Sequence, residues 1–424
     1  MASPKDDRGD TLPSFSLWHK TRMLPSFLAL PFAVAVGVFR ENKGRSWSRA
    51  AHIAALRFLL QRARNALDLK FGFRVTTAEL YATWARKSGA DVLTDELSEG
   101  ATLHWIGPRR EDRVLLFLHG GGYVLPARVE YFDMLESLQK EYKGAVGIAM
   151  LNYFLAPEHP FPKQLRQTVF AVQHLLDRGL SPSNIIIAGD SAGGNLVLQL
   201  ASQLLHPHPS LPTLQPQQPH PVTDTDISPL EFPEPFGGML LISPWTEFNT
   251  DAPSFRRNRT RDMIPPHSYQ LFADIVRQGI TPALHQHLEP GITPPGWWNG
   301  LGRVFPRVLI TAGEHEGLVD QIQRMAAVIA EQVQDTTVFI LPGGVHEDFI
   351  DAYASGEGES KSVLSFTASY VRVLLHGPSS ALFFKLLLLV YSLHDVFCRK
   401  AERERSFVNG FVEQLRSQAC IGYT

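Results

Sequence analysis

The sequence predicts an α/β fold with a mostly parallel central sheet, helices on both faces of the sheet and a helical cap. Short apolar runs with the composition of fully buried strands recur along the chain, and several of them lead into glycine-rich loops. Helix-forming stretches separate these runs, which is the pattern of parallel strands joined by helical crossovers. A site in such a sheet is expected outside the carboxyl ends of its strands.

The clearest signal is a serine turn at residues 189–194. The apolar run 185–188 leads directly into Gly-Asp-Ser-Ala-Gly-Gly, and the helix-forming stretch 195–200 follows. A turn of this kind is strained, and it lifts the hydroxyl of Ser191 to the top of the sheet. The glycines two before and two after the serine are needed because larger side chains would collide where strand and helix nearly touch. Ser191 is therefore a candidate nucleophile.

A second glycine loop, 119–123, follows the strand predicted at 114–118 and reads His-Gly-Gly-Gly-Tyr. Consecutive glycines leave backbone N–H groups uncovered. Such groups can hold the negative oxygen that develops when an acyl carbon becomes tetrahedral. We assign the N–H groups of Gly121, Gly122 and Ala192 to this oxyanion hole.

Three neighbouring residues are expected to support the site structurally: His119, Gly120 and Asp190. The first would hold the glycine loop through a side-chain hydrogen bond. The other interpretation of the loop, a phosphate-binding turn, requires Gly-Lys-Ser/Thr or Gly-x-Gly-x-x-Gly at a helix start, and neither pattern is present.

Two more loops follow the strands predicted at 308–312 and 336–341. The first loop carries acids and the second carries His346. A serine needs such partners, because its hydroxyl is a weak nucleophile until an imidazole takes the proton and a buried carboxylate orients the imidazole. The candidate acids are Glu314, Glu316 and Asp320.

Taken together, these segments resemble the hormone-sensitive-lipase-like branch of the α/β-hydrolases over roughly residues 70 to 375. The likeness is carried by 119–122, 189–194 and the Tyr-x-Leu-Ala-Pro-Glu segment within 153–160. The family has Asp-Pro-Leu-x-Asp at the acid, and the aligned stretch here is Glu-Gly-Leu-Val-Asp. The resemblance thus puts the catalytic acid on Glu316, with His346 as the base.

Within this branch the chain is most similar to fungal esterases related to steryl acetyl hydrolases, on the segments 103–107, 242–245 and 297–298. The likeness implies a serine hydrolase that removes a small acyl group, such as acetyl, from a hydrophobic alcohol through an acyl-enzyme. An amidase or transacylase would use the same residues. A non-catalytic small-molecule receptor is a third reading, although receptors on this fold typically lack the histidine that is present here as His346. The two tryptophans at 297–298 could line the substrate pocket or pack in the core.

Composition excludes several classes of protein and site. The net charge of −2 over 424 residues gives no reason to expect a nucleic-acid partner. The only cysteines, Cys398 and Cys420, allow one disulfide in the tail but no disulfide framework and no paired-cysteine metal site. No zinc-binding spacing is present, so we expect neither a metal nor another cofactor. Nothing in the sequence indicates an oligomeric state.

Residues 23–39 form an uncharged apolar run with basic residues on both sides. Three interpretations stand: a single spanning anchor, a helix lying on a membrane where substrate enters, and a buried cap helix. The run is short for a span, and Pro25 and Pro31 weaken it. The protein is accordingly expected to be membrane-associated, as at the endoplasmic reticulum, or cytoplasmic. The sequon at Asn258 hints at a luminal face.

The expected organisation has three parts. Residues 1–92 hold the apolar segment and cap helices, 93–376 form the catalytic domain, and 377–424 form an amphipathic tail. Within the catalytic domain, 206–235 is a proline-rich insertion and 246–302 is a second cap segment.

Overall fold

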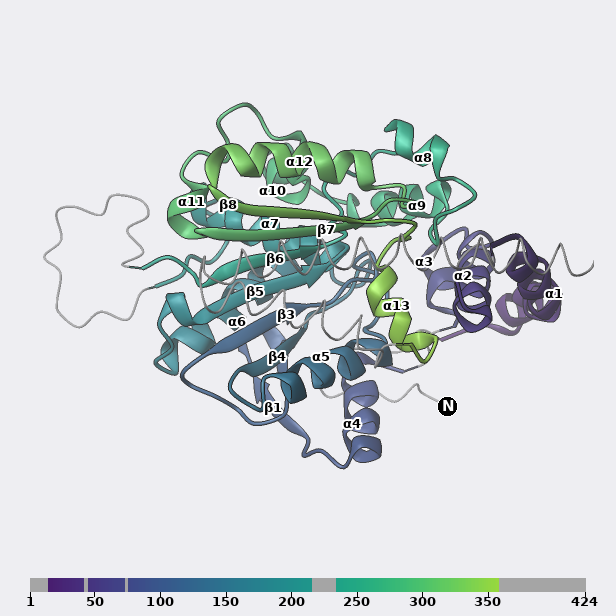
Figure 1. Ribbon diagram of the computed structural model, residues 1–424, viewed down its shortest axis with the longest axis horizontal. Helices are drawn as coiled ribbons and strands as arrows, with labels where there is room; N and C mark the ends of the chain where they lie inside the picture. The colour runs from purple at the N-terminus through teal and green to yellow at the C-terminus, as the bar shows by residue number, and fades with distance from the viewer. Residues whose placement is uncertain (1–13, 42–44, 73–74, 216–233, 358–424) are drawn as a thin grey trace, which may run out of the picture. The chain divides into compact units, whose positions relative to one another are not determined.

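The fold is organised around an eight-stranded sheet with strand order β1-β2-β4-β3-β5-β6-β7-β8 (Figure 1). This computed structural model describes residues 14–41, 45–72, 75–215 and 234–357. β2 is antiparallel to both of its neighbours, and every other pair is parallel. The strands are β1 (Leu93–Glu96), β2 (Thr102–Ile106), β3 (Val114–Leu118), β4 (Gly147–Asn152), β5 (Ile185–Asp190), β6 (Gly238–Ile242), β7 (Arg307–Gly313) and β8 (Asp335–Leu341).

Helices cover both faces of the sheet, so its central strands are buried throughout, as expected of a parallel sheet. α7 packs against β3, β5 and β6, and α12 packs against β7 and β8, whereas α5 packs against β2 and β4 and carries α13 (Figure 1). The predicted fold class is confirmed. These helices are α5 (Val129–Glu141), α6 (Lys163–Asp177), α7 (Ala192–Leu205), α12 (Val319–Gln332) and α13 (Asp348–Ala354).

Strand register brings the predicted loops to one edge of the sheet. Leu118 pairs with Gly189 at the ends of β3 and β5, and Gly313 pairs with Leu341 at the ends of β7 and β8. Because these strands are parallel, the loops that follow them leave the sheet on the same side. The glycine loop, the serine turn, the acid loop and the histidine loop therefore share one edge.

Two segments lie over this edge. The first contains α1 (Leu17–Glu41), α2 (Trp47–Leu60) and α3 (Ala66–Lys70), whereas α4 (Thr77–Ser88), which follows them in the chain, packs against α5. α1 packs along α2, and it contains the apolar run 23–39. The second segment contains α8 (Pro253–Arg257) and α9 (Pro266–Val276), whereas α10 (His285–Leu288) and α11 (Leu301–Val304), which follow in the chain, pack against α7.

The proposed domain boundaries stay predictions. The tail, 377–424, lies outside the described residues, as do both cysteines. Within the proline-rich insertion, 216–233 also lies outside them, and the described remainder contains neither helix nor strand after residue 205.

Candidate active site

The serine turn has the strained geometry that its glycines predicted. Ser191 has φ 49° and ψ −113°, a backbone conformation rare for a residue with a side chain. Hydrogen bonds hold it there: its N–H donates to Ile242 O at 2.8 Å, and its carbonyl accepts from Trp245 N at 3.0 Å. Glycine is required at 193, because a Cβ there would lie 1.9 Å from the carbonyl oxygen of Leu118. The turn thus presents the hydroxyl at the edge of the sheet.

A single imidazole joins the serine to an acid. His346 Nε2 lies 2.9 Å from Ser191 Oγ, and its Nδ1 lies 2.8 Å from Glu316 Oε2. The side chains of His346 and Glu316 are fully buried. The other carboxylate oxygen of Glu316 accepts the N–H of Gly313 at 2.8 Å, which leaves Oε2 for the imidazole. With these contacts, Nδ1 carries the proton and Nε2 faces the hydroxyl as a base.

The other two acids considered from the sequence have different partners. Glu314 accepts the N–H of Gly343 at 2.7 Å. Asp320 pairs with Arg257 and accepts the N–H of Ser254 at 2.8 Å. Only Glu316, among these three, contacts His346. The structure therefore brings together the three residues that the family resemblance selected.

The glycine loop lines the same space as the serine. Gly121 has φ 104° and Gly122 has φ 61°, and both border the cavity that Ser191 enters. No residue in the described part of the chain accepts a hydrogen bond from either N–H. Ala192 begins α7 directly after the serine, so its N–H is among the first donors of a helix, which have no partner within the helix. This arrangement suits the expected oxyanion hole.

The three supporting residues lie behind this loop. His119 Nδ1 donates to Gly120 O at 2.7 Å, and burial lowers the pKa of this histidine to about 4, so the ring is neutral. Its ring stacks on Tyr153, whose hydroxyl donates to His119 O at 2.6 Å. Asp190 accepts the N–H of Gly120 at 2.9 Å. A side chain at Gly120 would collide with the carboxyl groups of Asp190 and Glu347, which explains the glycine.

Asp262 is a buried acid that the sequence reasoning missed. Its carboxylate accepts the N–H of Gly317 at 2.7 Å and the N–H of His346 at 3.2 Å. One side chain thereby ties the acid loop to the histidine loop. No sequence pattern marks it, because it lies more than fifty residues along the chain from either loop.

Glu347, next to the histidine, was also missed. Its Oε1 lies 3.5 Å from His346 Nε2, and its other oxygen pairs with Arg128 at 3.1 Å. It also forms a hydrogen bond with Asp190. The only sequence signal for a role of Glu347 in the site was its position directly after His346. That signal is weak, because acidic side chains are usually exposed to solvent.

These acids set the proton affinities of the site. Burial alone would lower the pKa of His346, but Glu316 and Glu347 outweigh it and hold that pKa well above its usual value. Burial raises the pKa of Glu316 to about 7, against the hydrogen bond from His346. Burial also opposes ionisation of Glu347, yet His346 and Arg128 bring its pKa down to about 2. The pKa of Asp190 is raised well above its usual value, first by burial and then by the charge of Glu347 and the hydrogen bond to it.

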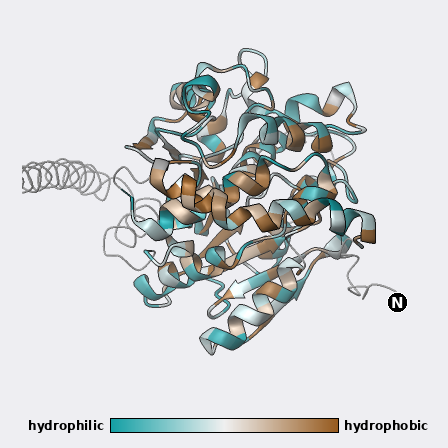
Figure 2. Ribbon diagram, turned by 90° about the vertical axis from the view of Figure 1, so that its right-hand side faces the viewer, coloured by the Kyte–Doolittle hydropathy of each residue, from teal (hydrophilic) through white to brown (hydrophobic). Residues whose placement is uncertain are grey.

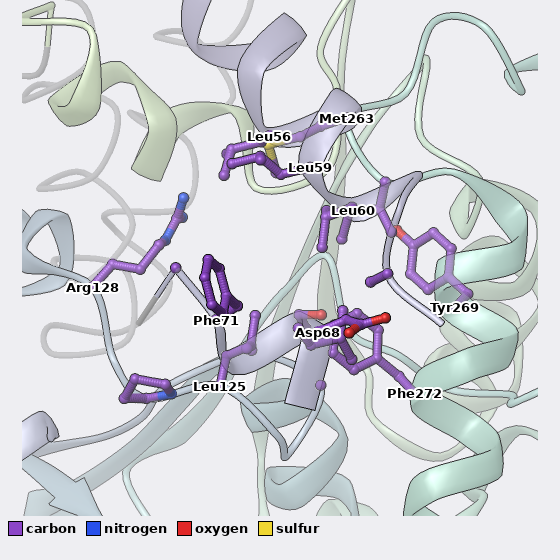
Figure 3. A pocket seen from close by; sticks show the side chains of 18 of the residues that line it. Leu56, Leu59, Leu60, Asp68, Phe71, Leu125, Arg128, Met263, Tyr269 and Phe272 are labelled. Atoms are coloured by element: carbon purple, nitrogen blue, oxygen red, sulfur yellow. The ribbon is translucent and has the colours of Figure 1, made fainter. Parts of the chain in front are cut away.

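A cavity of about 210 Å³ lies above the serine. In Figure 3 the leucines of α2 and the side chains of Met263, Tyr269 and Phe272 surround it, with Arg128 at one side. Its lining is mostly aliphatic and aromatic, and Ser191 and the glycine loop border it. Within the described ranges, no group of His, Cys, Asp or Glu side chains is arranged to hold a metal ion.

Within residues 246–302, the structure changes one expectation and decides between two alternatives that the sequence left open. Asn258 of the sequon is buried, and its amide donates to Glu314 O and Glu316 O, so it braces the acid loop and is not open to a glycan. Trp298 is buried and donates to Thr293, and Trp297 donates to Ser202; neither borders the cavity. Of the two readings of these tryptophans, packing is the one that the structure supports.

Comparison with known proteins gives the same architecture. A family model described as alpha/beta hydrolase fold matches residues 115–350. A crystal structure of an esterase from the bacterial hormone-sensitive lipase family superposes with a TM-score of 0.54 and 24% identity, over 78% of this chain and 99% of that one. At this identity the likeness shows the fold alone.

Two curated relatives are named as hydrolases. An esterase from Acinetobacter venetianus is 26% identical over 265 residues, which is 62% of this chain and 75% of that protein. An acetyl-hydrolase from Streptomyces hygroscopicus is 29% identical over 164 residues, 38% of this chain and 46% of that protein. Both names agree with the expected enzyme class, the carboxylic ester hydrolases. The chain belongs to the α/β hydrolase fold family, as its glycine and serine motifs predicted.

Proposed function

We propose that this chain hydrolyses carboxylic esters by two-step acyl transfer on Ser191. The observation that carries the proposal is the imidazole of His346, which lies within hydrogen-bond distance of both a strained serine hydroxyl and a buried carboxylate. That arrangement activates a hydroxyl at neutral pH. The cavity above it has room for a small apolar ester.

In the first step, Ser191 Oγ attacks the ester carbonyl while its proton passes to His346 Nε2. Glu316 stabilises the imidazolium through Nδ1–H. The carbonyl oxygen, now negative, accepts hydrogen bonds from the N–H groups of Gly121, Gly122 and Ala192, each worth roughly 3 kcal/mol of barrier. The Nε2 proton then goes to the alcohol oxygen as the ester bond breaks. Water attacks the acyl-enzyme by the same route and releases the acid.

The proposed substrate is a small acyl ester, such as an acetate, of a hydrophobic alcohol. The apolar lining of the cavity supports the hydrophobic part, since it offers an alcohol few hydrogen-bonding partners. The acetyl part is supported by the acetyl-hydrolase among the relatives and by the sequence resemblance to steryl acetyl hydrolases.

The two segments over the site form a cap in this proposal. Residues 1–92 supply α1 to α3, and 246–302 supply Met263, Tyr269 and Phe272, all of which contribute to the cavity wall. The catalytic domain, 93–376, supplies the serine, the acid, the histidine and the glycine loop.

The test is covalent trapping combined with a substrate series. A fluorophosphonate probe should add one adduct to the peptide that contains Ser191, as seen by mass spectrometry. Ser243 is a matched control, because it is also buried and its hydroxyl lies 3.4 Å from Glu316. Labelling of Ser243, or no labelling of the active protein, would contradict the acyl-enzyme.

The substrate series compares the acetate, butyrate and octanoate esters of one hydrophobic alcohol with the matching acetamide. We expect the acetate ester to give the highest kcat/KM. A higher value for the amide would point to an amidase, and saturable binding without turnover would point to a receptor.

A further inference from the structure

One side of α1 is exposed and apolar along its whole length. The side chains on this face recur at helical spacing, and five of them, at positions 17, 18, 28, 32 and 39, are more than 70% exposed. In Figure 2, turned so that the side where α1 lies in Figure 1 faces the viewer, brown predominates on the helices in front. The large exposed side chains of the face are Leu17, Trp18, Leu24, Leu28, Phe32, Val36 and Phe39.

The opposite side of α1 is docked on the protein near both ends. In the first turns, Arg22 pairs with Asp68 and Met23 is buried. Near the last turn, a Cβ on Gly37 would lie 2.5 Å from Ala54 Cβ, and Val38 is buried. Because the helix is held along its length, its side and not its end faces outward.

This docking decides between lying on a membrane and crossing it. In the part of the chain that the structure describes, α1 is the one helix with the length and apolar character to span a bilayer. A span needs about 30 Å of helix free of the folded domain. α1 would have to undock at Gly37 and at Met23 to supply that length, exposing the cavity wall.

The segment around α1 is strongly basic, although the whole chain has a net charge of −2. Residues 14–72 contain ten Lys and Arg against two Asp and Glu. Some of these bases are paired, such as Arg22 with Asp68 and Lys70 with Glu158. Others are exposed and form no ion pair with any described residue, namely Lys20, Arg62 and Arg64. An apolar helix face in a segment that also carries exposed bases complements a surface with anionic headgroups.

The inner face of α1 also borders the space above the serine. Met23 and Phe27 line the same cavity as Ser191. Phe27 is at the same time 36% exposed, so one side chain borders both the cavity and the outside. The wall between the outer apolar face and the candidate site is thus a single helix.

We propose that α1 lies in the plane of an anionic lipid surface, with its outer face among the lipids, and that apolar esters pass from the lipid into the cavity beside Phe27. The second half of this statement rests on the proposed function, whereas the first half does not. A bilayer surface is the occupant that accounts for the apolar face and the unpaired bases together.

The test is vesicle co-flotation of the full chain. Vesicles of equal parts phosphatidylcholine and phosphatidylserine should bind it, phosphatidylcholine alone should bind it more weakly, and salt should weaken binding to the mixture. Replacing Leu24, Leu28 and Phe32 together by Gln should reduce binding about tenfold or more. The matched control replaces Val92, Val328 and Val338 by Gln, which are exposed valines outside α1, and should bind as the native chain does.

Three outcomes would overturn the in-plane helix. Equal binding by the α1 triple variant and the native chain would remove its outer face from the interaction. Retention in the membrane after an alkaline carbonate wash would mean that α1 spans. A dimer in solution that the triple variant abolishes, with no vesicle binding by the native chain, would mean that a second copy covers this face.

Separate readouts keep this proposal distinct from the proposed function. Ser191→Ala should bind vesicles normally, and the α1 triple variant should hydrolyse a soluble p-nitrophenyl acetate at the native rate without vesicles. Against a long-chain alcohol acetate held in the vesicles, the same variant should lose about tenfold in rate. An unchanged rate on that substrate would overturn passage beside α1 while leaving ester hydrolysis intact.

Discussion

Two sides of the cavity, the floor that carries the catalytic residues and the roof of helices that covers them, differ in the side chains that form them. The floor places Ser191, His346 and Glu316 at strand ends, and hydrogen bonds of 2.8 to 2.9 Å connect them. The roof, formed by α1, α2 and α9, meets the cavity almost entirely with aliphatic and aromatic side chains. Proton transfer requires that the reacting atoms be placed to within a fraction of an ångström. Enclosing an apolar group requires only a cavity of fitting shape that excludes water.

This difference predicts which kinetic parameter a substitution in each region will change. Changes on the floor should act on kcat, because they alter groups that interact with the transition state. Changes on the roof should act on KM for hydrophobic substrates, because those contacts bind substrate and transition state alike. Substitutions in both regions can break or sharpen that division.

The largest effect is expected for Ser191→Ala. Removing the nucleophile should lower kcat/KM for p-nitrophenyl acetate by about 100,000-fold or more. The hydroxyl is not needed for the backbone hydrogen bonds of the turn, so thermal unfolding should stay close to native. Residual turnover within tenfold of native would remove this serine from the chemistry.

Glu316→Gln should cost about 1,000- to 10,000-fold in kcat. The amide keeps the shape, but it no longer stabilises the imidazolium, and it can present an N–H where Nδ1–H needs an acceptor. Glu314→Gln is the control, since Glu314 contacts the N–H of Gly343 and not His346. Equal losses in the two variants would contradict the assignment of the acid.

Asp262→Asn should lower both stability and kcat. The amide oxygen can accept from Gly317 or from His346 but cannot hold both N–H groups as the carboxylate does. One buried N–H left without a partner costs roughly 1–3 kcal/mol of unfolding free energy. Urea denaturation measures the first effect and steady-state kinetics the second. A native kcat in the folded variant would mean that the two loops hold their positions without this side chain.

A roof substitution, Leu59→Ala, should leave kcat for p-nitrophenyl acetate unchanged. It should raise KM roughly tenfold for the acetate of a long-chain alcohol, because apolar contact with the bound alcohol is lost. A loss of kcat on both substrates would show that packing in the roof affects the positions of the catalytic residues in the floor.

The smallest effect concerns the pH dependence of Glu347→Gln. The carboxylate of Glu347 helps to raise the pKa of His346, so its neutralisation should lower that pKa. The base is active when neutral, and the acid limb of the kcat/KM profile should therefore move to lower pH. A limb that stays in place would show that Glu316 alone sets the proton affinity of the imidazole.

The strands and glycine loops were predictable because their signals are local. The apolar run 114–118 is β3, and 308–312 lies within β7. The serine turn brings backbone segments a few positions apart so close together that a side chain would collide at 189 or 193. The glycines at these positions therefore mark the turn in the sequence. Assigning the acid to Glu316 required the family resemblance or the structure, because three acids lie close together in this part of the sequence. Local sequence does not say which one faces the histidine.

The roles of Asp262 and Glu347 could not be predicted from local sequence. The first accepts hydrogen bonds from two loops that lie 55 and 84 residues away along the chain. The second is a charge whose effect depends on burial beside Arg128 and Asp190. Neither burial nor a partner from a distant element is recorded in the spacing of nearby residues.

By itself, then, the sequence determined the strands that precede the site loops, the strained turn at Ser191 and the presence of a base and an acid downstream, since backbone sterics and apolar periodicity act over a few residues. The tertiary structure decided which acid meets His346, what encloses the cavity and how α1 is oriented. Those outcomes depend on which distant surfaces meet, because burial and pairing arise only when the chain has folded upon itself.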